Sequence, residues 1–348
     1  MKAYVQRGHG GPEVCSFEDI DDPAPGPGEV VIRTLAAGLN RLDLLQRAAP
    51  LVRGFHLPHV AGLDVVGVVV AAHHEADSRR AALGSRVLVD PVTTCRTCRR
   101  CRDGQEPYCQ FLQTVGSTRQ GGFAELVAVA ADRCWSVPAH LSVAEAAAVP
   151  VAYMTAWQAL VTVGAVQQRE VVLVNGANAG VSTAVIQLAK RAGATVIGTI
   201  RDTARAAEML AIGCDHVVDA TDPTTIADQV HGLTDGLGAD LVIDHLGPAQ
   251  FAASVDAMSV EGRMVFCGTT TGTEVNLSLT DVYWWGRKLL GAGGYRPSDV
   301  GDMLDAMNAS RLIPVVAEVA PFEELPRLLD RLEHGSVFGK LVVTFDGS

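Results

Sequence analysis

Short apolar runs, rich in valine, follow one another along the first part of the chain, and glycine and proline separate them. Runs of this kind between turn residues are typical of β-strands. We expect strands over residues 29–36, 61–71, 86–89 and 124–129. Up to about Val151 the pattern therefore predicts an irregular, mostly antiparallel β domain, residues 1–151.

The pattern changes from about Ala152, where buried apolar runs alternate with longer helical stretches. The apolar runs lie at 171–174, 195–199, 241–244 and 264–267. Strands that alternate with helices in this way are typical of a doubly wound parallel sheet. The sequence therefore predicts an α/β protein whose second domain spans residues 152–296.

The last segment, 297–348, combines helical and β-type patterns. It carries a helical stretch at 299–309, an apolar run at 312–319, a helix near 322–333 and a final strand at 341–345. We expect this segment to return to the first domain. The length of 348 residues also favours two domains, because one hydrophobic core rarely grows to that size.

The formal net charge of −11 counts against a nucleic-acid or anionic-membrane surface, because both need clustered lysine and arginine. No apolar stretch approaches the ~18 residues of a membrane span, and the first residues lack the pattern of a signal peptide. We expect a cytoplasmic protein that acts on a small molecule, with no nucleic acid and no membrane as partner.

Four cysteines stand close together with the spacing Cys-x2-Cys-x2-Cys-x7-Cys; they are Cys95, Cys98, Cys101 and Cys109. A zinc ion held by four thiolates is tetrahedral and closed, so it braces the fold and leaves no position for a substrate. The alternative is a disulfide cluster, but cysteines this close in sequence rarely reach disulfide geometry. We expect one structural Zn²⁺ in a lobe over about residues 92–112.

A glycine-containing turn joins the predicted strand 171–174 to the helical stretch 184–192. Small residues there let the backbone approach a pyrophosphate, and the start of the helix favours its charge. Ala179 and Ser182 stand where glycine is more usual. The alternative is an ordinary strand-to-helix turn. The residues we expect to bind the dinucleotide here are Gly176, Ala177, Asn178, Ala179, Gly180, Val181 and Ser182.

The choice of cofactor is read at the end of the next strand, near Thr199. An enzyme specific for NAD places an acid there for the ribose hydroxyls, whereas this chain has Arg201, with Arg205 a turn later. Arginine suits the 2′-phosphate of NADPH. Asp202 serves as the ribose acid if the register shifts, so NADH stays open as the less favoured cofactor.

Together these residues resemble the medium-chain dehydrogenase/reductase superfamily over nearly the whole chain. The matching stretches outside the cysteine lobe and the glycine turn lie at 9–14, 25–30, 38–43, 121–125, 147–150, 155–157 and 338–340. The resemblance implies a GroES-like β domain plus a Rossmann domain, with the active site in the cleft between them. It also implies a homodimer, joined through the edge of the Rossmann sheet.

The zinc alcohol dehydrogenases of this superfamily hold a second, catalytic zinc. Its ligand positions fall here on Asn40, Leu63 and Val151, and Asp64 follows Leu63. None of the three offers the thiolate or imidazole that zinc prefers, and Asp64 alone could not hold the ion. The groups that relay the alcohol proton are replaced by leucines as well. We therefore expect no catalytic zinc.

A closer likeness is to the quinone oxidoreductase and enoyl reductase branches. It rests on the Asn-x-x-Asp pattern at 40–43 and on the stretch 244–247, which contains His245 and Leu246. The enoyl thioester reductases use a tyrosine acid where this chain has Leu51. The likeness implies cofactor contacts at both of these stretches.

NADPH in an apolar pocket can deliver hydride to a conjugated carbonyl compound without a metal, because conjugation spreads the developing charge. Our catalytic candidates are Asn40, Asp64 and Tyr153, although Asn40 can be a loop cap, Asp64 a buried hydrogen-bonding group and Tyr153 a packing residue. By resemblance, the other cofactor contacts are Thr155, Cys267, Gly268, Thr269, Phe338 and Lys340.

Three functions stay open. The first is an NADPH-dependent reductase of an enone, a quinone or a polyene, in the last case with reductive cyclisation, acting on an apolar or conjugated substrate. The second is a zinc-free alcohol dehydrogenase or carbonyl reductase. The third is a protein that binds NADPH without turnover.

Overall fold

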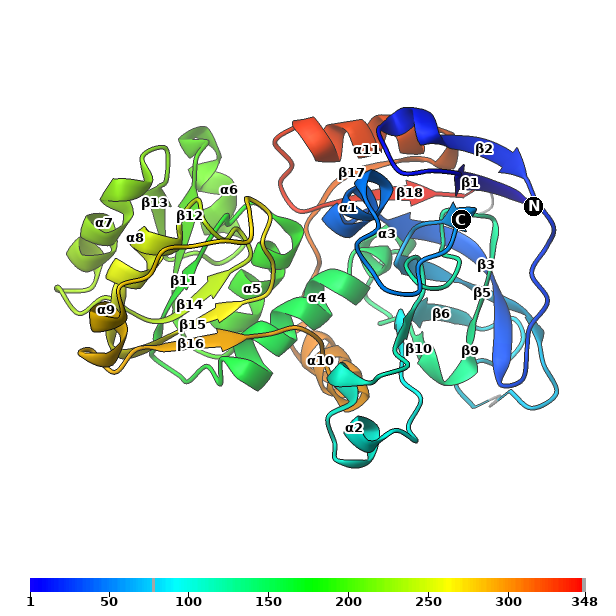
Figure 1. Ribbon diagram of the computed structural model, residues 1–348, viewed down its shortest axis with the longest axis horizontal. Helices are drawn as coiled ribbons and strands as arrows, with labels where there is room; N and C mark the ends of the chain where they lie inside the picture. Colours follow the sequence, from blue (N-terminus) through cyan, green and yellow to red (C-terminus); the bar gives the residue numbers. More distant parts are fainter. Residues whose placement is uncertain (77–78, 346–348) are drawn as a thin grey trace. The chain divides into compact units, whose positions relative to one another are not determined.

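The computed structural model describes residues 1–76 and 79–345. Contacts between residues divide the chain into two compact units. Unit 1 comprises Met1–Val151 and Arg296–Ser348, and unit 2 comprises Ala152–Tyr295. Each unit has its own sheet and its own core, and their elements are labelled in Figure 1.

The main sheet of unit 1 joins segments that lie far apart in the sequence. Strand β3 pairs antiparallel with β5, with β9 and with β18 of the C-terminal segment. Gly38, at the end of β3, lies opposite both Asp64 of β5 and Val342 of β18. The first residues of β5 and β18 therefore meet at the same end of the sheet. The strands are β10 (Cys134–Ser136), β6 (Arg86–Val89), β5 (Asp64–Ala72), β3 (Glu29–Gly38), β18 (Lys340–Thr344), β17 (Val316–Pro321) and β9 (Leu126–Ala130).

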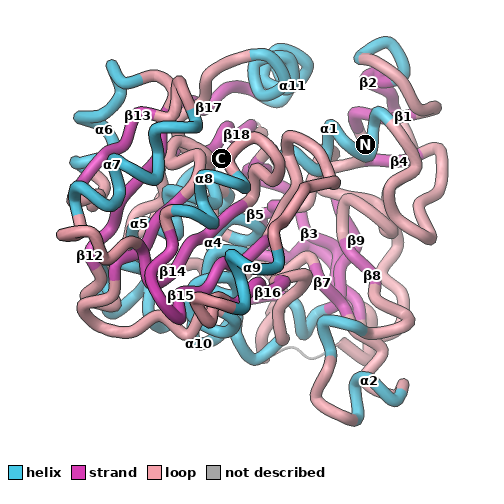
Figure 2. Tube along the Cα trace, turned by 60° about the vertical axis from the view of Figure 1, so that its left-hand side comes forward, coloured by secondary structure: helices cyan, strands magenta, loops and turns pink. Residues whose placement is uncertain are grey.

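Smaller elements complete unit 1. Helix α11 places Leu325, Leu328 and Leu329 on one face, and these side chains share a core with residues of β1 and β18. Figure 2 shows the helix as a cyan coil. The remaining elements of unit 1 are β1 (Lys2–Gln6), β2 (Cys15–Asp19), β4 (His59–Val60), β7 (Val92–Thr93), β8 (Gln113–Thr114), α1 (Arg41–Ala48), α2 (Arg99–Arg102), α3 (Val143–Ala147), α10 (Pro297–Ser310) and α11 (Leu325–His334).

Unit 2 contains a parallel six-stranded sheet in the order β13-β12-β11-β14-β15-β16. Strands β12 and β13 lie on one side of β11, and β14, β15 and β16 lie on the other. The direction in which the chain adds strands therefore reverses between β11 and β14. Ligands of open parallel sheets bind outside the carboxyl ends of the strands at such a point. The strands are β11 (Val171–Val174), β12 (Thr195–Ile200), β13 (His216–Asp219), β14 (Ala239–Asp244), β15 (Met258–Phe266) and β16 (Lys288–Gly291).

The central strands β11, β12 and β14 are buried on both faces, which explains their continuous apolar runs. Leu173, Ile197 and Val242 share a core with helices α7 and α8. Their neighbours along each strand point to the opposite face, and they are buried too. The helices are α4 (Pro150–Trp157), which continues into a π-helical turn at Gln158–Val163, α5 (Gly180–Arg191), α6 (Ala206–Ala211), α7 (Ile226–Leu233), α8 (Phe251–Asp256) and α9 (Leu279–Tyr283).

The fold class predicted from the sequence is confirmed, with a mostly antiparallel unit and a doubly wound parallel sheet. Strands β6 and β11 begin and end at the predicted residues. Strand β15 starts six residues before the predicted run. The prediction missed these residues because Glu261 and Gly262 interrupt the apolar pattern of the strand. Within the described part of the chain, no helix has both the length and the apolar composition of a membrane span.

Candidate functional site

A buried polar cluster lies at the end of the main sheet in unit 1, where β3, β5 and β18 meet. Asn40 precedes the first residue of α1, Asp64 is the first residue of β5, and Lys340 is the first residue of β18. Their exposed fractions are 8%, 0% and 6%. A buried charge is stable only with a partner, so the contacts among these side chains decide what the cluster can do.

The Lys340 ammonium has three acceptors in this cluster. Its Nζ donates to Asp64 Oδ2 at 2.8 Å, to Asn40 Oδ1 at 2.6 Å and to the Leu39 carbonyl oxygen at 2.6 Å. These contacts use all three of its N–H groups. Asp64 Oδ2 also accepts from Asn40 Nδ2 at 3.0 Å, and Asp64 Oδ1 accepts from the Val151 backbone N–H at 2.8 Å. The network is closed and its two charges balance.

Asp43 holds the backbone around this network. Its Oδ2 accepts from the Asn40 backbone N–H at 2.7 Å, and its Oδ1 accepts from the Gly62 backbone N–H at 3.2 Å. Burial raises the pKa of Asp43 to about 7, against the lowering effect of the Asn40 N–H and the Lys340 charge. Asp43 therefore positions both Asn40 and the segment before Asp64.

The three positions that hold catalytic zinc in the zinc alcohol dehydrogenases come together around Asp64. Asn40 and the Val151 backbone both bond to Asp64, and Leu63 precedes it in the chain. Leu63 and the Val151 side chain carry no ligand atom, and the Lys340 ammonium already balances the Asp64 carboxylate. These residues do not fit a catalytic zinc ion.

The glycine-containing turn of unit 2 follows β11 directly and leads into α5 (Figure 1). Gly176 has a φ of +56°, and a Cβ there would lie 3.2 Å from Leu246 and 3.4 Å from His245. Residue Ala179 caps α5 without a side-chain hydrogen bond to the first helical N–H groups. The turn therefore fits a pyrophosphate, which needs close backbone approach and open N–H groups.

Two predicted cofactor residues contact each other behind this turn. Ser182, 1% exposed, lies 2.8 Å through its Oγ from Nε2 of His245. The same hydroxyl lies 3.0 Å from the Asn175 carbonyl oxygen. Thr199 also supports the turn, because its Oγ1 accepts from the Gly176 backbone N–H at 3.0 Å.

The segment after β12 carries the residues expected to choose the cofactor. Arg205 pairs with Asp202 at 3.4 Å and with Glu208 at 3.3 Å. Arg201 is exposed, and the described residues include no side-chain partner for it. The Asp202 carboxylate, which is the candidate to bind a ribose, is thus already paired with the Arg205 guanidinium group.

The other predicted residues differ in exposure. The hydroxyl of Tyr153 is hydrogen-bonded to Gln187 Oε1 at 2.5 Å, and burial raises the pKa of Tyr153. Cys267 donates to the Asp244 carbonyl oxygen at 3.6 Å, and burial raises its pKa to about 12. The remaining residues are half-buried or exposed: Thr155 lies within α4, Gly268 and Thr269 follow β15, and Phe338 precedes β18.

Sequence reasoning gave Asn40 and Asp43 a joint role only as the alternative of a loop cap, and it did not identify Gln187 as the partner of Tyr153. The Asn-x-x-Asp spacing is a signal for this joint role, because it matches a helix start whose third residue reaches back to the cap. Gln187 has no such signal, since its contact depends on how α5 packs.

The four cysteines of the lobe lie in one cluster, and their sulfur atoms are within 4.8 Å of one another. Four of the Sγ–Sγ distances are 3.5, 3.6, 3.9 and 4.0 Å. A tetrahedral zinc with Zn–S bonds of about 2.3 Å requires roughly 3.8 Å between sulfurs. Backbone N–H groups of Thr97 and Gln110 lower the pKa of the Cys95 and Cys98 thiols, while burial raises the pKa of Cys101. The cluster can hold a metal ion.

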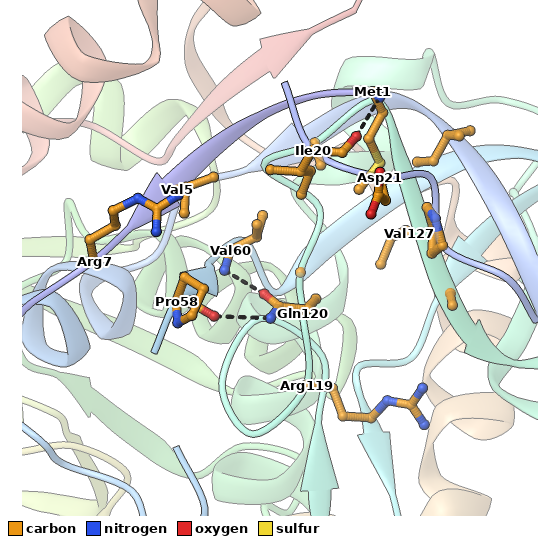
Figure 3. A pocket seen from close by; sticks show the side chains of 15 residues that line it. Met1, Val5, Arg7, Ile20, Asp21, Pro58, Val60, Arg119, Gln120 and Val127 are labelled. Atoms are coloured by element: carbon orange, nitrogen blue, oxygen red, sulfur yellow. Dashed lines mark hydrogen bonds between the residues drawn. The ribbon is translucent and has the colours of Figure 1, made fainter. Parts of the chain in front are cut away.

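A cavity of about 470 Å³ opens elsewhere in unit 1. Figure 3 shows Val5, Ile20 and Val60 among its apolar walls. In its wall, the Gln120 side chain accepts from the Val60 backbone N–H at 2.6 Å and donates to the Pro58 carbonyl oxygen at 3.1 Å. None of the predicted site residues lines this cavity, so its size does not mark the site.

Two family models match the chain. The alcohol dehydrogenase GroES-like domain matches residues 26–139, and the zinc-binding dehydrogenase model matches residues 180–309. The first match lies in unit 1, and the second covers most of unit 2 and continues into α10.

Similar proteins span the whole chain. The D-arabinose 1-dehydrogenase (NADP(+)) of Saccharolobus solfataricus is 30% identical over 95% of each chain. The acryloyl-coenzyme A reductase of Sulfurisphaera tokodaii is 27% identical over 99% of each chain. A crystal structure of an NAD-dependent alcohol dehydrogenase has a TM-score of 0.93 and 37% identity over 99% of each chain. The chain therefore belongs to the medium-chain dehydrogenase/reductase superfamily of NAD(P)H-dependent oxidoreductases.

Proposed function

We propose that this protein is an NADPH-dependent reductase that delivers hydride to a conjugated C=C bond of an enone, a quinone or a polyene. The observation that carries the proposal is the closed network of Asn40, Asp64 and Lys340, whose residues do not suit a Lewis-acidic zinc. A conjugated substrate needs no such ion, because its own oxygen takes up the developing charge. The similarity to an acryloyl-coenzyme A reductase supports this reaction class.

Asn40 supplies the polar contact to the reacting groups in this proposal. Its Nδ2 carries two hydrogens, of which one goes to Asp64 Oδ2 at 3.0 Å and the other faces the Gly38 carbonyl at 3.5 Å, the outer limit of a hydrogen bond. The Lys340 ammonium, 2.6 Å from Asn40 Oδ1, polarises the amide and strengthens its N–H donors. We assign the weakly bonded N–H to the substrate oxygen or to the nicotinamide ribose.

Asp64 and Tyr153 take supporting roles. Both oxygens of Asp64 are engaged, so we propose that it fixes the amide of Asn40 and is not a base. The Tyr153 hydroxyl is bonded to Gln187, and its raised pKa makes it a poor acid for the enolate. We therefore propose that solvent supplies the proton.

NADPH is the proposed source of hydride, and the turn at 176–182 is its proposed pyrophosphate site. Arg201 is our candidate for the 2′-phosphate, because Arg205 already neutralises Asp202. The similarity to an NADP(+)-dependent dehydrogenase supports this preference, while the structural relative named as NAD-dependent keeps NADH as the alternative. Thr155, Phe338 and the strand-end residues 267–269 remain proposed cofactor contacts.

We also propose that the cysteine cluster holds one structural zinc ion, because its sulfur distances match a tetrahedral site. The homodimer, joined through the exposed edge strand β16, and the cytoplasmic location are part of the same proposal. β16 is the last strand of the unit 2 sheet, and its outer edge is open to pairing among the described residues.

The second candidate is a zinc-free alcohol dehydrogenase or carbonyl reductase, which the similarity to D-arabinose 1-dehydrogenase favours. Incubation with NADPH deuterated at the transferable C4 position and a panel of enones, quinones, ketones and sugars separates the two. Deuterium on a carbon β to a carbonyl, located by NMR, supports conjugate reduction. Deuterium on a carbinol carbon supports the second candidate instead. Binding of NADPH with no transfer to any compound leaves a cofactor-binding protein without turnover.

A further inference from the structure

Ser182 is the position at which the turn departs from a glycine-rich pattern, and the structure gives it a partner. Ser182 is the third residue of α5, and His245 follows the last residue of β14. The two residues are 63 positions apart in sequence, yet their side chains meet at 2.8 Å. The contact therefore joins the first turn of α5 to the carboxyl end of a neighbouring strand.

The chemistry of the donors and acceptors sets the direction of the hydrogen bonds that Ser182 makes. The backbone carbonyl oxygen of Asn175 can only accept, so the Ser182 hydroxyl donates its hydrogen to this oxygen, across 3.0 Å. Ser182 Oγ is then the acceptor for the Nε2–H of His245. Burial lowers the pKa of His245 and favours the neutral ring. The ring hydrogen is then assigned to Nε2, because the Ser182 hydroxyl has already donated to Asn175.

Asn175 closes the chain of contacts. Its Nδ2 donates to Asp244 Oδ1 at 2.9 Å and to Ser254 Oγ at 2.8 Å, and it is completely buried. Asp244 directly precedes His245. The contacts thus run from His245 through Ser182 and Asn175 back to Asp244, and they tie the ends of β11 and β14 to the start of α5.

We propose that Ser182 and His245 form a positioning pair that fixes the pyrophosphate turn against β14. In a regular glycine-rich turn, a glycine at this position allows the helix to pack closely on the strand and so fixes the turn. The proposal rests on the proposed binding of NADPH in unit 2. The His245 ring lies 3.4 Å from the point where a Cβ on Gly176 would stand, so the pair also supports the turn from behind. Loss of either partner leaves α5 free to shift its open N–H groups away from the phosphates.

The test measures the Kd of NADPH by fluorescence titration, without substrate, for the wild type, S182A, H245L and the double variant. We expect about tenfold weaker binding for each single variant and no further loss in the double variant, because both remove one contact. We expect H245Q, whose amide can donate to Ser182, to bind within about threefold of the wild type. The KM for NADPH should rise with the Kd, while kcat at saturating NADPH stays within about twofold.

The control is H231A in the same unit. The ring nitrogens of His231, in α7, lie 3.2 and 3.0 Å from the carbonyl oxygens of Gly236 and Asp256. None of these residues belongs to the turn at 176–182, so the loss of His231 should leave the Kd unchanged. Thermal unfolding of every variant separates misfolding from lost affinity. If S182A or H245L does not fold, H245Q tests the pair in their place. A tenfold loss of NADPH affinity in folded H245Q contradicts the proposed pair.

Wild-type affinity in both single variants, or losses that add in the double variant, would overturn the positioning pair while leaving conjugate reduction intact. A wild type that binds neither NADPH nor NADH would overturn the proposed function, and the pair with it. The deuterium experiment tests the site of hydride transfer and does not involve these variants.

Discussion

The substitution Lys340→Met tests the buried network most directly. It keeps the length of the side chain but removes the ammonium, which is 6% exposed and pairs with an Asp64 side chain that is 0% exposed. The Asp64 carboxylate is then buried with one amide and one backbone N–H as partners, and the oxygens of Leu39 and Asn40 lose a donor. Removing one partner of a buried ion pair costs about 3–5 kcal/mol.

A loss of this size should be plain in thermal unfolding. For a domain of about 200 residues, the approximate size of unit 1, each kcal/mol lowers Tm by roughly 2–4 °C, so we expect a decrease of roughly 6–20 °C. Hydrogen exchange followed by mass spectrometry should place the lost protection in β3, β5 and β18, because the network joins these strands. Peptides of unit 2 should keep their protection.

The double variant K340M/D64N and a surface control complete the experiment. Asn at position 64 removes the unpaired charge, so the double variant should recover at least half of the lost Tm. Lys2→Met removes an exposed ion pair with Glu323 at 3.8 Å, and it should cost less than about 1 kcal/mol. A decrease of less than about 2 °C for K340M, or additive losses in the double variant, would refute the idea of a balanced buried pair.

Three further predictions concern other sites. Elemental analysis should find about one zinc per chain, and Cys98→Ser, which removes one of the four thiolates, should lower the zinc content and destabilise the lobe. Two zinc ions per wild-type chain would contradict the conclusion that the residues around Asp64 do not hold a catalytic zinc. Burial raises the pKa of Asp43 from its ordinary value of 3.8 to about 7, so the folded protein binds more protons than the unfolded chain between these pH values. The stabilising contribution of Asp43 is therefore present below about pH 4 and is lost as the pH rises through 7, and Asp43→Asn should flatten the dependence of Tm on pH in this range. Arg201→Ala should weaken NADPH binding about tenfold and leave NADH within about twofold, and equal effects on both cofactors would assign the 2′-phosphate to other residues.

The strands could be predicted from the sequence where burial is complete. Val171–Val174 is apolar at every position because helices cover both faces of the sheet, so its ends are visible in the pattern. Met258–Phe266 was predicted only in part, because Glu261 and Gly262 lie inside the strand and break the apolar run. In its first half only Met258 pairs with β14, opposite Ala239, and the register then shifts before Arg263, which no local pattern records.

The residues of the polar site could also be predicted in part, but their mutual contacts could not. The resemblance assigned Lys340 to the cofactor, and the residues around Asp64 indicated only that a buried carboxylate needs a partner. The pairing of the two spans 276 residues and is set by the register of β3 with β5 and β18. A spacing that long leaves no trace in a sequence pattern. Ser182 and His245 were each assigned to the cofactor for the same reason, since their mutual contact depends on the packing of α5.

The position of β18 beside β3 has a consequence for the synthesis of this chain. The main sheet of unit 1 begins with residues near the N-terminus, but β17 and β18 join it only from the last segment. Unit 2 is continuous in sequence, so it can fold as soon as it leaves the ribosome. The earlier strands of unit 1 must wait, with the open edge of β3 exposed, until β18 emerges. Nascent chains stalled before residue 340 should therefore bind chaperones through unit 1, while their unit 2 is already resistant to protease.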